Sequence, residues 1–219
     1  MSDFSELEKL QCAVIGVCPL YIEGFFGSVL YVLTFYPFII TMSLFAISLY
    51  INEFYLFAVS MILTFNSALN YLLRLAFGVP AIYPGCGPTY GMPSMATQHA
   101  ILFESIFVSF ILIYKPQKSM MLMLFIKLFT SAVMFAWVYI GINSILELTV
   151  GAVIGLVEGM IFQRFMYWIN KNHLYRILDT PIFKWMTIED NLCNYIFKED
   201  NETSIEERQW FIFVLFFSQ

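Results

Sequence analysis

Uncharged apolar runs follow one another along the chain and predict helices that cross a membrane. Residues 28–52 and residues 54–73 contain no charged side chain. A helix of about 20 residues spans a hydrocarbon core of about 30 Å, because each residue adds about 1.5 Å. Only residues 51–53 join the two runs, so we expect a tight antiparallel hairpin between two spans.

Three later runs extend this pattern. We expect further spans over residues 94–114, 119–136 and 145–168, the second of which contains Lys127. Residues 11–27 are almost wholly apolar but include a proline and a glycine, which predicts an irregular first span or a re-entrant segment. The expected fold class is therefore all-α, a polytopic membrane bundle of five to six transmembrane helices.

The segment 76–98 interrupts the apolar pattern. It is dense in proline and glycine, and these residues rule out a continuous helix. Loops of about 20 residues without secondary structure of their own are usually functional or ordered by partners. This loop is therefore the first place to look for a site.

The chain divides into three parts. Residues 1–27 form an N-terminal interfacial or irregular segment, residues 28–168 the membrane bundle, and residues 169–219 a more charged tail. The tail ends in an apolar stretch that is too short to cross a bilayer. This stretch is either an interfacial anchor or a docking segment for another protein subunit, and the residues expected to make the docking contact are Trp210, Phe211, Phe213, Leu215 and Phe216.

Composition supports the membrane interpretation. Hydrophobic residues make up 60% of the chain and charged residues 12%, whereas soluble domains are about 45–50% apolar. The lipid bilayer is thus an expected partner. The net charge is −5 and there is no basic stripe, which argues against nucleic-acid binding. The four cysteines are scattered without zinc-site spacing, and nothing in the sequence implies a metal or another cofactor.

The positions of lysine and arginine predict the orientation. The loop 75–98 and the turn 137–144 contain neither residue type, and the basic residues gather at the opposite ends of the expected spans, at Lys115, Lys118, Arg164, Lys171, Arg176 and Lys184. Basic residues near spans favour the cytoplasmic side. We therefore expect the loop to face the lumen or exterior and the tail to be cytoplasmic, so that the sequon at Asn201 stays unmodified.

The motif "YGMPSMATQH" over residues 90–99 and the pattern "WVYIGINSILELTVGAVIG" from Trp137 onward point to a known family. Over residues 54–165 the chain resembles the type-2 phosphatidic acid phosphatase superfamily, especially its dolichyl-diphosphatase-like branch. In that family a histidine attacks phosphorus and an aspartate one helical turn on orients it. A second histidine protonates the leaving group, and a lysine and two arginines bind the phosphoryl oxygens.

The resemblance keeps the residues that shape the family's second and third motifs but not those that react. Pro93 and Ser94 match the second motif, while Ala96 stands in the place of its histidine. In the third motif, Asn143 stands for the nucleophilic histidine and Glu147 for the aspartate. Neither an alanine nor an asparagine replaces an imidazole as an acid or a nucleophile.

The phosphate-binding cations are also replaced. Trp137 stands for the arginine of the third motif, Val79 for that of the first, and Leu72 for the lysine. A transferring phosphoryl group needs fixed positive charge. The resemblance therefore implies a catalytically inactive member of the superfamily, kept for a structural or assembly role in a membrane complex or virion.

Two rival functions use other residues. A divergent lipid phosphate or isoprenyl diphosphate phosphatase would rely on His99 and Arg74. A lipid-binding or transport protein would hold its ligand in the old substrate cleft near Arg74, Tyr90 and Trp137. Intramembrane carboxylates are functional candidates by default, yet a metal site of His99, Glu104 and Glu147 lacks recognisable spacing.

The same polar residues can also be explained by hydrogen bonds and ion pairs within the bundle, without a role in catalysis or binding. Glu104 or Glu158 is expected to pair with Lys127, and His99 to satisfy a loop carbonyl. Glu147 lies one turn after Asn143 and is expected to accept a hydrogen bond from its amide.

Overall fold

The computed structural model describes residues 25–81, 90–114, 120–139 and 142–185, and this part of the chain is all-helical without strands. The prediction of an all-α fold is therefore confirmed for the described residues. The N-terminal segment before residue 25 and the tail from residue 186, with its expected docking residues, lie outside them. The helices are α2 (Phe25–Thr34), α3 (Tyr36–Ile51), α4 (Phe54–Phe77), α5 (Met95–Tyr114), α6 (Met120–Tyr139), α7 (Ile145–Asn172), α8 (Leu174–Leu178) and α9 (Pro181–Trp185).

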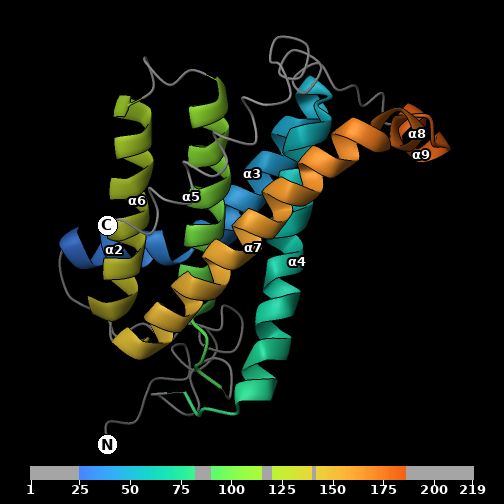
Figure 1. Cartoon of the computed structure of the whole chain (residues 1–219). Helices are drawn as coiled ribbons and strands as arrows, with labels where there is room; N and C mark the ends of the chain where they lie inside the picture. Colours follow the sequence, from blue (N-terminus) through green and yellow to red (C-terminus); the bar gives the residue numbers. More distant parts are fainter. Residues whose placement is uncertain (1–24, 82–89, 115–119, 140–141, 186–219) are drawn as a thin grey trace, which may run out of the picture.

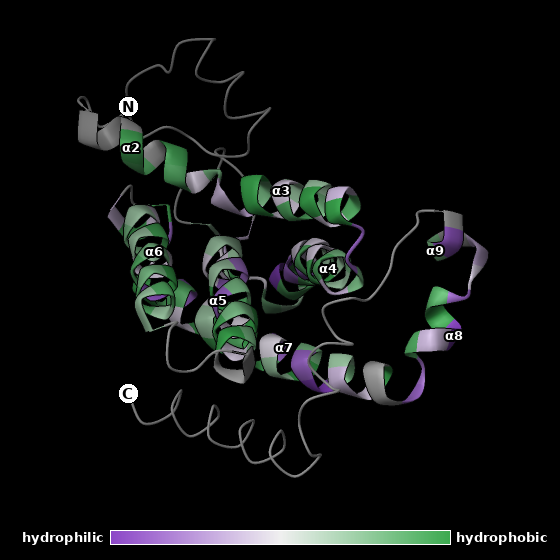
Figure 2. Ribbon diagram, turned by 90° about the horizontal axis from the view of Figure 1, so that it is seen from above, coloured by the Kyte–Doolittle hydropathy of each residue, from purple (hydrophilic) through white to green (hydrophobic). Residues whose placement is uncertain are grey.

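Three helices are long and apolar enough to cross a membrane: Phe54–Phe77, Met120–Tyr139 and the Ile145–Ile169 part of α7. Their outward faces carry large hydrophobic side chains such as Phe65, Phe125 and Ile161, and Figure 2 shows the apolar colouring most clearly on α6. These features indicate an integral membrane protein. Helices α3 and α5 are also apolar, but their apolar stretches are shorter.

The expected single span over residues 28–52 is wrong, because the structure divides it into α2 and α3. Pro37 lies in the first turn of α3 and has no N–H group to continue a helical ladder from α2. The Phe35 N–H instead bonds to the Val32 carbonyl at 3.1 Å, which closes a tight turn. As a result, α2 runs crosswise to α6 in Figure 1.

The tight hairpin expected at residues 51–53 is present. Asn52 ends α3 in the left-handed conformation with φ of 56°, which asparagine tolerates better than most residues. Its successor Glu53 is the N-cap of α4. The two helices therefore turn back on each other, and Ser48 in α3 is buried at the start of this connection.

Helix α5 is the centre of the bundle. In Figure 2 it lies between α6 and α4, with α3 on one side and α7 on the other. The main apolar core forms where α4, α5 and α7 meet, around residues such as Val59, Leu63, Leu102, Ile106 and Phe162. Helix α5 is thus the element against which the other helices are placed.

Three glycines let α7 approach α5 at backbone distance. They are spaced four residues apart, at Gly151, Gly155 and Gly159. A Cβ at Gly151 would lie 2.7 Å from the Ser94 carbonyl oxygen, and one at Gly155 would collide with the Gln98 carbonyl. Small residues at this spacing permit close helix packing in membranes. The glycine row therefore fixes the register of α7 on α5.

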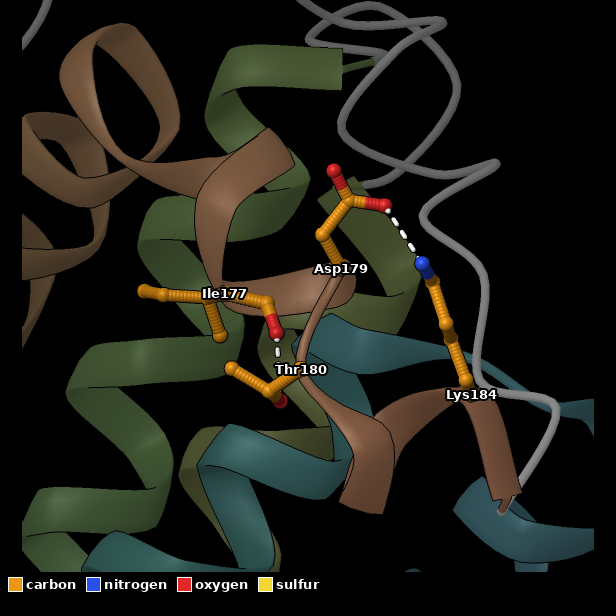
Figure 3. Close-up of polar contacts among 4 residues, drawn as sticks. All are labelled: Ile177, Asp179, Thr180 and Lys184. Atoms are coloured by element: carbon orange, nitrogen blue, oxygen red, sulfur yellow. Dashed lines mark hydrogen bonds and ion pairs between the residues drawn. The ribbon is translucent and has the colours of Figure 1, made fainter.

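Beyond the bundle, α7 continues past residue 168 to Asn172 and is followed by α8 and α9. Lys184 pairs with Asp179 at 3.1 Å, and both side chains are largely exposed. Thr180 Oγ1 donates to the Ile177 carbonyl at 2.8 Å (Figure 3). Exposed pairs of this kind contribute about 0–1 kcal/mol, so these two short helices depend mainly on apolar packing, with Phe183 against Phe54 and Phe57.

The glycine row yields the first testable prediction. Gly155→Ala adds one methyl group where the Gln98 backbone already lies, so it should lower the free energy of unfolding by about 1–3 kcal/mol. The matched control is Val153→Ile, which adds one methyl on an exposed face of the same helix and should change it by less than about 0.5 kcal/mol. Equilibrium unfolding in mixed detergent micelles measures both. Equal effects of the two substitutions would contradict the close packing.

Candidate functional site

Three chain segments meet at one end of the bundle, toward the bottom of Figure 1: the end of α4, the start of α5 and the start of α7. The Ser94 N–H donates to the Glu147 carbonyl oxygen at 3.1 Å, which joins the start of α5 to α7. Arg74 Nε donates to the Pro93 carbonyl at 3.1 Å, which joins α4 to the same place. Residues at the positions that resemble the second and third phosphatase motifs are therefore adjacent in space.

Glu147 is the most connected side chain of this region. Its Oε2 accepts hydrogen bonds from Asn143 Nδ2 at 2.8 Å and from the Ser144 N–H at 3.0 Å. Ser144 Oγ in turn accepts from the Glu147 N–H at 3.2 Å, which completes a capping box. A carboxylate in the first turn also interacts favourably with the helix dipole. The predicted bond from Asn143 to Glu147 is thus confirmed and belongs to the helix start.

Ser94 connects this helix start to α5. Its hydroxyl donates to Asn143 Oδ1 at 3.2 Å and accepts from Thr97 Oγ1 at 3.2 Å. Ser94, Thr97, Asn143 and Glu147 are all buried. Both polar ends of the Asn143 amide and the Ser94 hydroxyl therefore already have partners within the protein.

Main-chain atoms fill the space beside the carboxylate. A Cβ at Gly91 would lie 2.6 Å from Glu147 Oε1, so the loop backbone rests directly against this oxygen. The Gly91 N–H also bonds to the Val79 carbonyl at 3.0 Å, and Pro80 and Tyr90 form a β-bridge. The loop is thereby held over the cluster.

Arg74 is the basic residue of this cluster. Besides its bond to the Pro93 carbonyl, its guanidinium interacts electrostatically with Glu147. Asn70, one turn earlier on α4, donates to the same carbonyl at 3.3 Å. Arg74 therefore positions the Pro93 segment and balances the charge of Glu147.

His99 faces a different part of the bundle. Its Nε2 lies 2.9 Å from Thr41 Oγ1 in α3, and the Thr41 hydroxyl donates to the Pro37 carbonyl at 2.7 Å. The threonine oxygen is therefore the acceptor, which assigns the imidazole proton to Nε2. The partner of His99 is a threonine hydroxyl and not the loop carbonyl expected from the sequence.

The side chains at the remaining predicted positions do not take part in this hydrogen-bond cluster. Leu72 is 60% exposed and Val79 is 37% exposed, so neither side chain is enclosed at the site. Trp137 packs against a cluster of Tyr36, Ala100 and Val133. Tyr90 is half-buried in the loop, and Ala96 is buried. The three residues expected to bind lipid, Arg74, Tyr90 and Trp137, are thus distributed over α4, the loop and α6.

The intramembrane carboxylates have separate partners. Glu104 interacts electrostatically with Lys127, which agrees with one of the two pairings expected from the sequence. Glu158 instead accepts a hydrogen bond from Gln98 Nε2 at 2.8 Å. Within the described ranges, no group of three or more histidine, cysteine, aspartate or glutamate residues is placed to hold a metal ion.

Two features of this region were not predicted. The carboxamides of Asn70 and Gln98 bond to each other at 2.7 Å, although each residue lies in an expected span. The glycine spacing of four in α7 was also overlooked. Buried amides and regular glycines in apolar runs are the sequence signals that would have indicated both.

The cluster yields a second prediction. Glu147→Ala removes the bonds to Asn143 and the Ser144 N–H and leaves buried donors unpaired, so the free energy of unfolding should fall by about 2–4 kcal/mol. Glu147→Gln keeps one oxygen acceptor, so it should lower the free energy of unfolding by less than Glu147→Ala does. The control is Thr149→Ala, an exposed threonine two residues on. Equilibrium unfolding in mixed micelles measures the series, and an unchanged stability of Glu147→Ala would contradict a structural role.

Comparison with known proteins does not assign the chain to a family. No family model, no curated protein and no solved structure matches it. The resemblance to the phosphatase superfamily therefore rests on the motif residues of the sequence.

Proposed function

We propose that the protein is a catalytically inactive, type-2 phosphatidic acid phosphatase-like membrane protein with a structural or assembly role. The observation that carries this proposal is the closed hydrogen-bond cluster of Ser94, Asn143 and Glu147. At the positions where the family has a nucleophile and its orienting carboxylate, these side chains bond to each other and hold helix ends together.

The chemistry of the cluster supports the same conclusion. The Asn143 amide nitrogen donates to Glu147 and has no basic lone pair with which to attack phosphorus. Ala96, in the place of the proton donor, is buried and carries no proton. A histidine phosphatase needs both functions in reach of one phosphoryl group, and neither is present at these positions.

Electrostatics support it further. A loose phosphoryl-transfer transition state spreads charge over three oxygens and needs several fixed cations. At the motif positions Leu72, Val79 and Trp137 are neutral, and Arg74 is engaged by the Pro93 carbonyl and Glu147. Removing a single transition-state donor commonly costs about 10²–10³ in rate, so a site without these cations has little catalytic power.

The assembly role rests on the sequence of the tail and on the bundle. We propose five to six membrane spans, with the apolar helices α3 and α5 adding to the three long ones. The cluster of Ser94, Asn143 and Glu147 would face the lumen or exterior, and the tail would lie in the cytoplasm, as the lysine and arginine distribution favours. The apolar residues from Trp210 to Phe216 would then dock another subunit from the cytoplasmic side.

This proposal predicts the outcome of an activity assay. The purified full chain in detergent should release phosphate from phosphatidate and from an isoprenyl diphosphate no faster than the background. His99→Ala should leave that rate unchanged, because His99 bonds to Thr41 and not to the cluster. The control for assay sensitivity is an active lipid phosphatase in the same detergent. Release that disappears in His99→Ala would contradict the proposal and establish a relocated active site.

A further inference from the structure

A second group of buried polar side chains lies deeper in the bundle, where α4, α5 and α7 meet. Asn70 Nδ2 donates to Gln98 Oε1 at 2.7 Å, and Gln98 Nε2 donates to Glu158 Oε1 at 2.8 Å. Each residue comes from a different helix, and Asn70 and Gln98 are fully buried. Two amides and one carboxylate are therefore aligned across an otherwise apolar core.

Asn66 extends this row. It precedes Asn70 by four residues, so the two lie on the same face of α4. Its exposed fraction is 0%, and neither its Oδ1 nor its Nδ2 has a hydrogen-bond partner within the described residues. An unpaired buried amide costs about 1–3 kcal/mol, so this fully enclosed asparagine has both a donor and an acceptor free to bind a small polar partner.

Glu158 also carries an unpaired buried polar atom. Its Oε1 is bonded to Gln98, but Oε2 is buried without a partner. The other intramembrane carboxylate, Glu104, interacts electrostatically with Lys127 of α6. An ionised carboxylate among spanning helices requires a counter-charge, and the described neighbour of Glu158 is a neutral amide.

We propose that Glu158 and Asn66, with the carboxamides of Asn70 and Gln98 as the supporting row, form an intramembrane binding site for an alkali-metal cation. Hard cations prefer carboxylate and amide oxygens, and among the buried side chains of the described residues Glu158 Oε2 and Asn66 Oδ1 are two such oxygens without partners. One carboxylate balances one positive charge, which favours a monovalent ion over Ca²⁺ or Mg²⁺. This site is separate from the Ser94, Asn143 and Glu147 cluster and does not depend on the function proposed for it.

Cation-dependent stability of the full chain tests the site. Thermal unfolding in detergent is followed while NaCl or KCl replaces N-methylglucamine chloride at constant ionic strength. We expect a saturable rise in the unfolding temperature with Na⁺ or K⁺, and the more effective ion identifies the ligand. Glu158→Gln should abolish the rise. Asn66→Leu should increase the cation concentration that gives half of the rise by at least tenfold. Glu104→Gln, the matched buried carboxylate beside Lys127, should retain it.

Direct binding to the unaltered protein keeps the test decisive if a variant fails to fold. Equilibrium binding of ²²Na⁺ or ⁸⁶Rb⁺, the latter as a K⁺ substitute, should saturate at about one ion per chain for the preferred cation. Absence of saturable binding for both ions would overturn the proposal and assign the neutralisation of Glu158 to a proton. Stabilisation that persists in Glu158→Gln would also overturn it, because the ion would then act elsewhere.

Discussion

The close contact between α5 and α7 is the constraint on which the rest of the structure depends. Gly151 and Gly155 bring the two backbones together without side chains between them, and Gly159 leaves room for the Ser105 side chain. This contact places the Glu147 carbonyl against the Ser94 N–H. It also places Gln98 beside Glu158. Both polar groups of the bundle thus follow from one packing register, in which van der Waals contact replaces the hydrophobic effect that is weak between helices in lipid.

The cluster at the helix ends gives the residues at the proposed motif positions a structural role. Asn143 and Glu147 are spaced one turn apart, which suits a reacting histidine and its carboxylate but equally suits an amide and a capping carboxylate. The capping box holds the first turn of α7, and Ser94 ties that turn to α5. Arg74 completes the arrangement by fixing the Pro93 segment. Packing and hydrogen bonding therefore account for the arrangement of these side chains.

Sequence reasoning predicted the helices with strong, uninterrupted apolar runs. The ranges of α4, α5, α6 and α7 agree with expectation within a few residues, and so does the turn at Asn52. The break at Phe35 was missed because hydropathy does not register the single N–H that Pro37 lacks. The Asn143–Glu147 bond was predictable from helical spacing. The direction of His99 toward Thr41 was not, because it depends on how α3 packs on α5.

The central claim is that the side chains at the motif positions hold helices together and do not react. A double-mutant cycle between Ser94 and Asn143, the pair that bridges α5 and the start of α7, tests it most directly. Ser94→Ala, Asn143→Ala and the double variant are compared by equilibrium unfolding in mixed micelles. The account predicts a coupling energy of about 0.5–1.5 kcal/mol between the two sites. If the decreases in the free energy of unfolding of the two single variants add up to that of the double variant within about 0.3 kcal/mol, the two side chains do not interact. That result would contradict the proposed structural role.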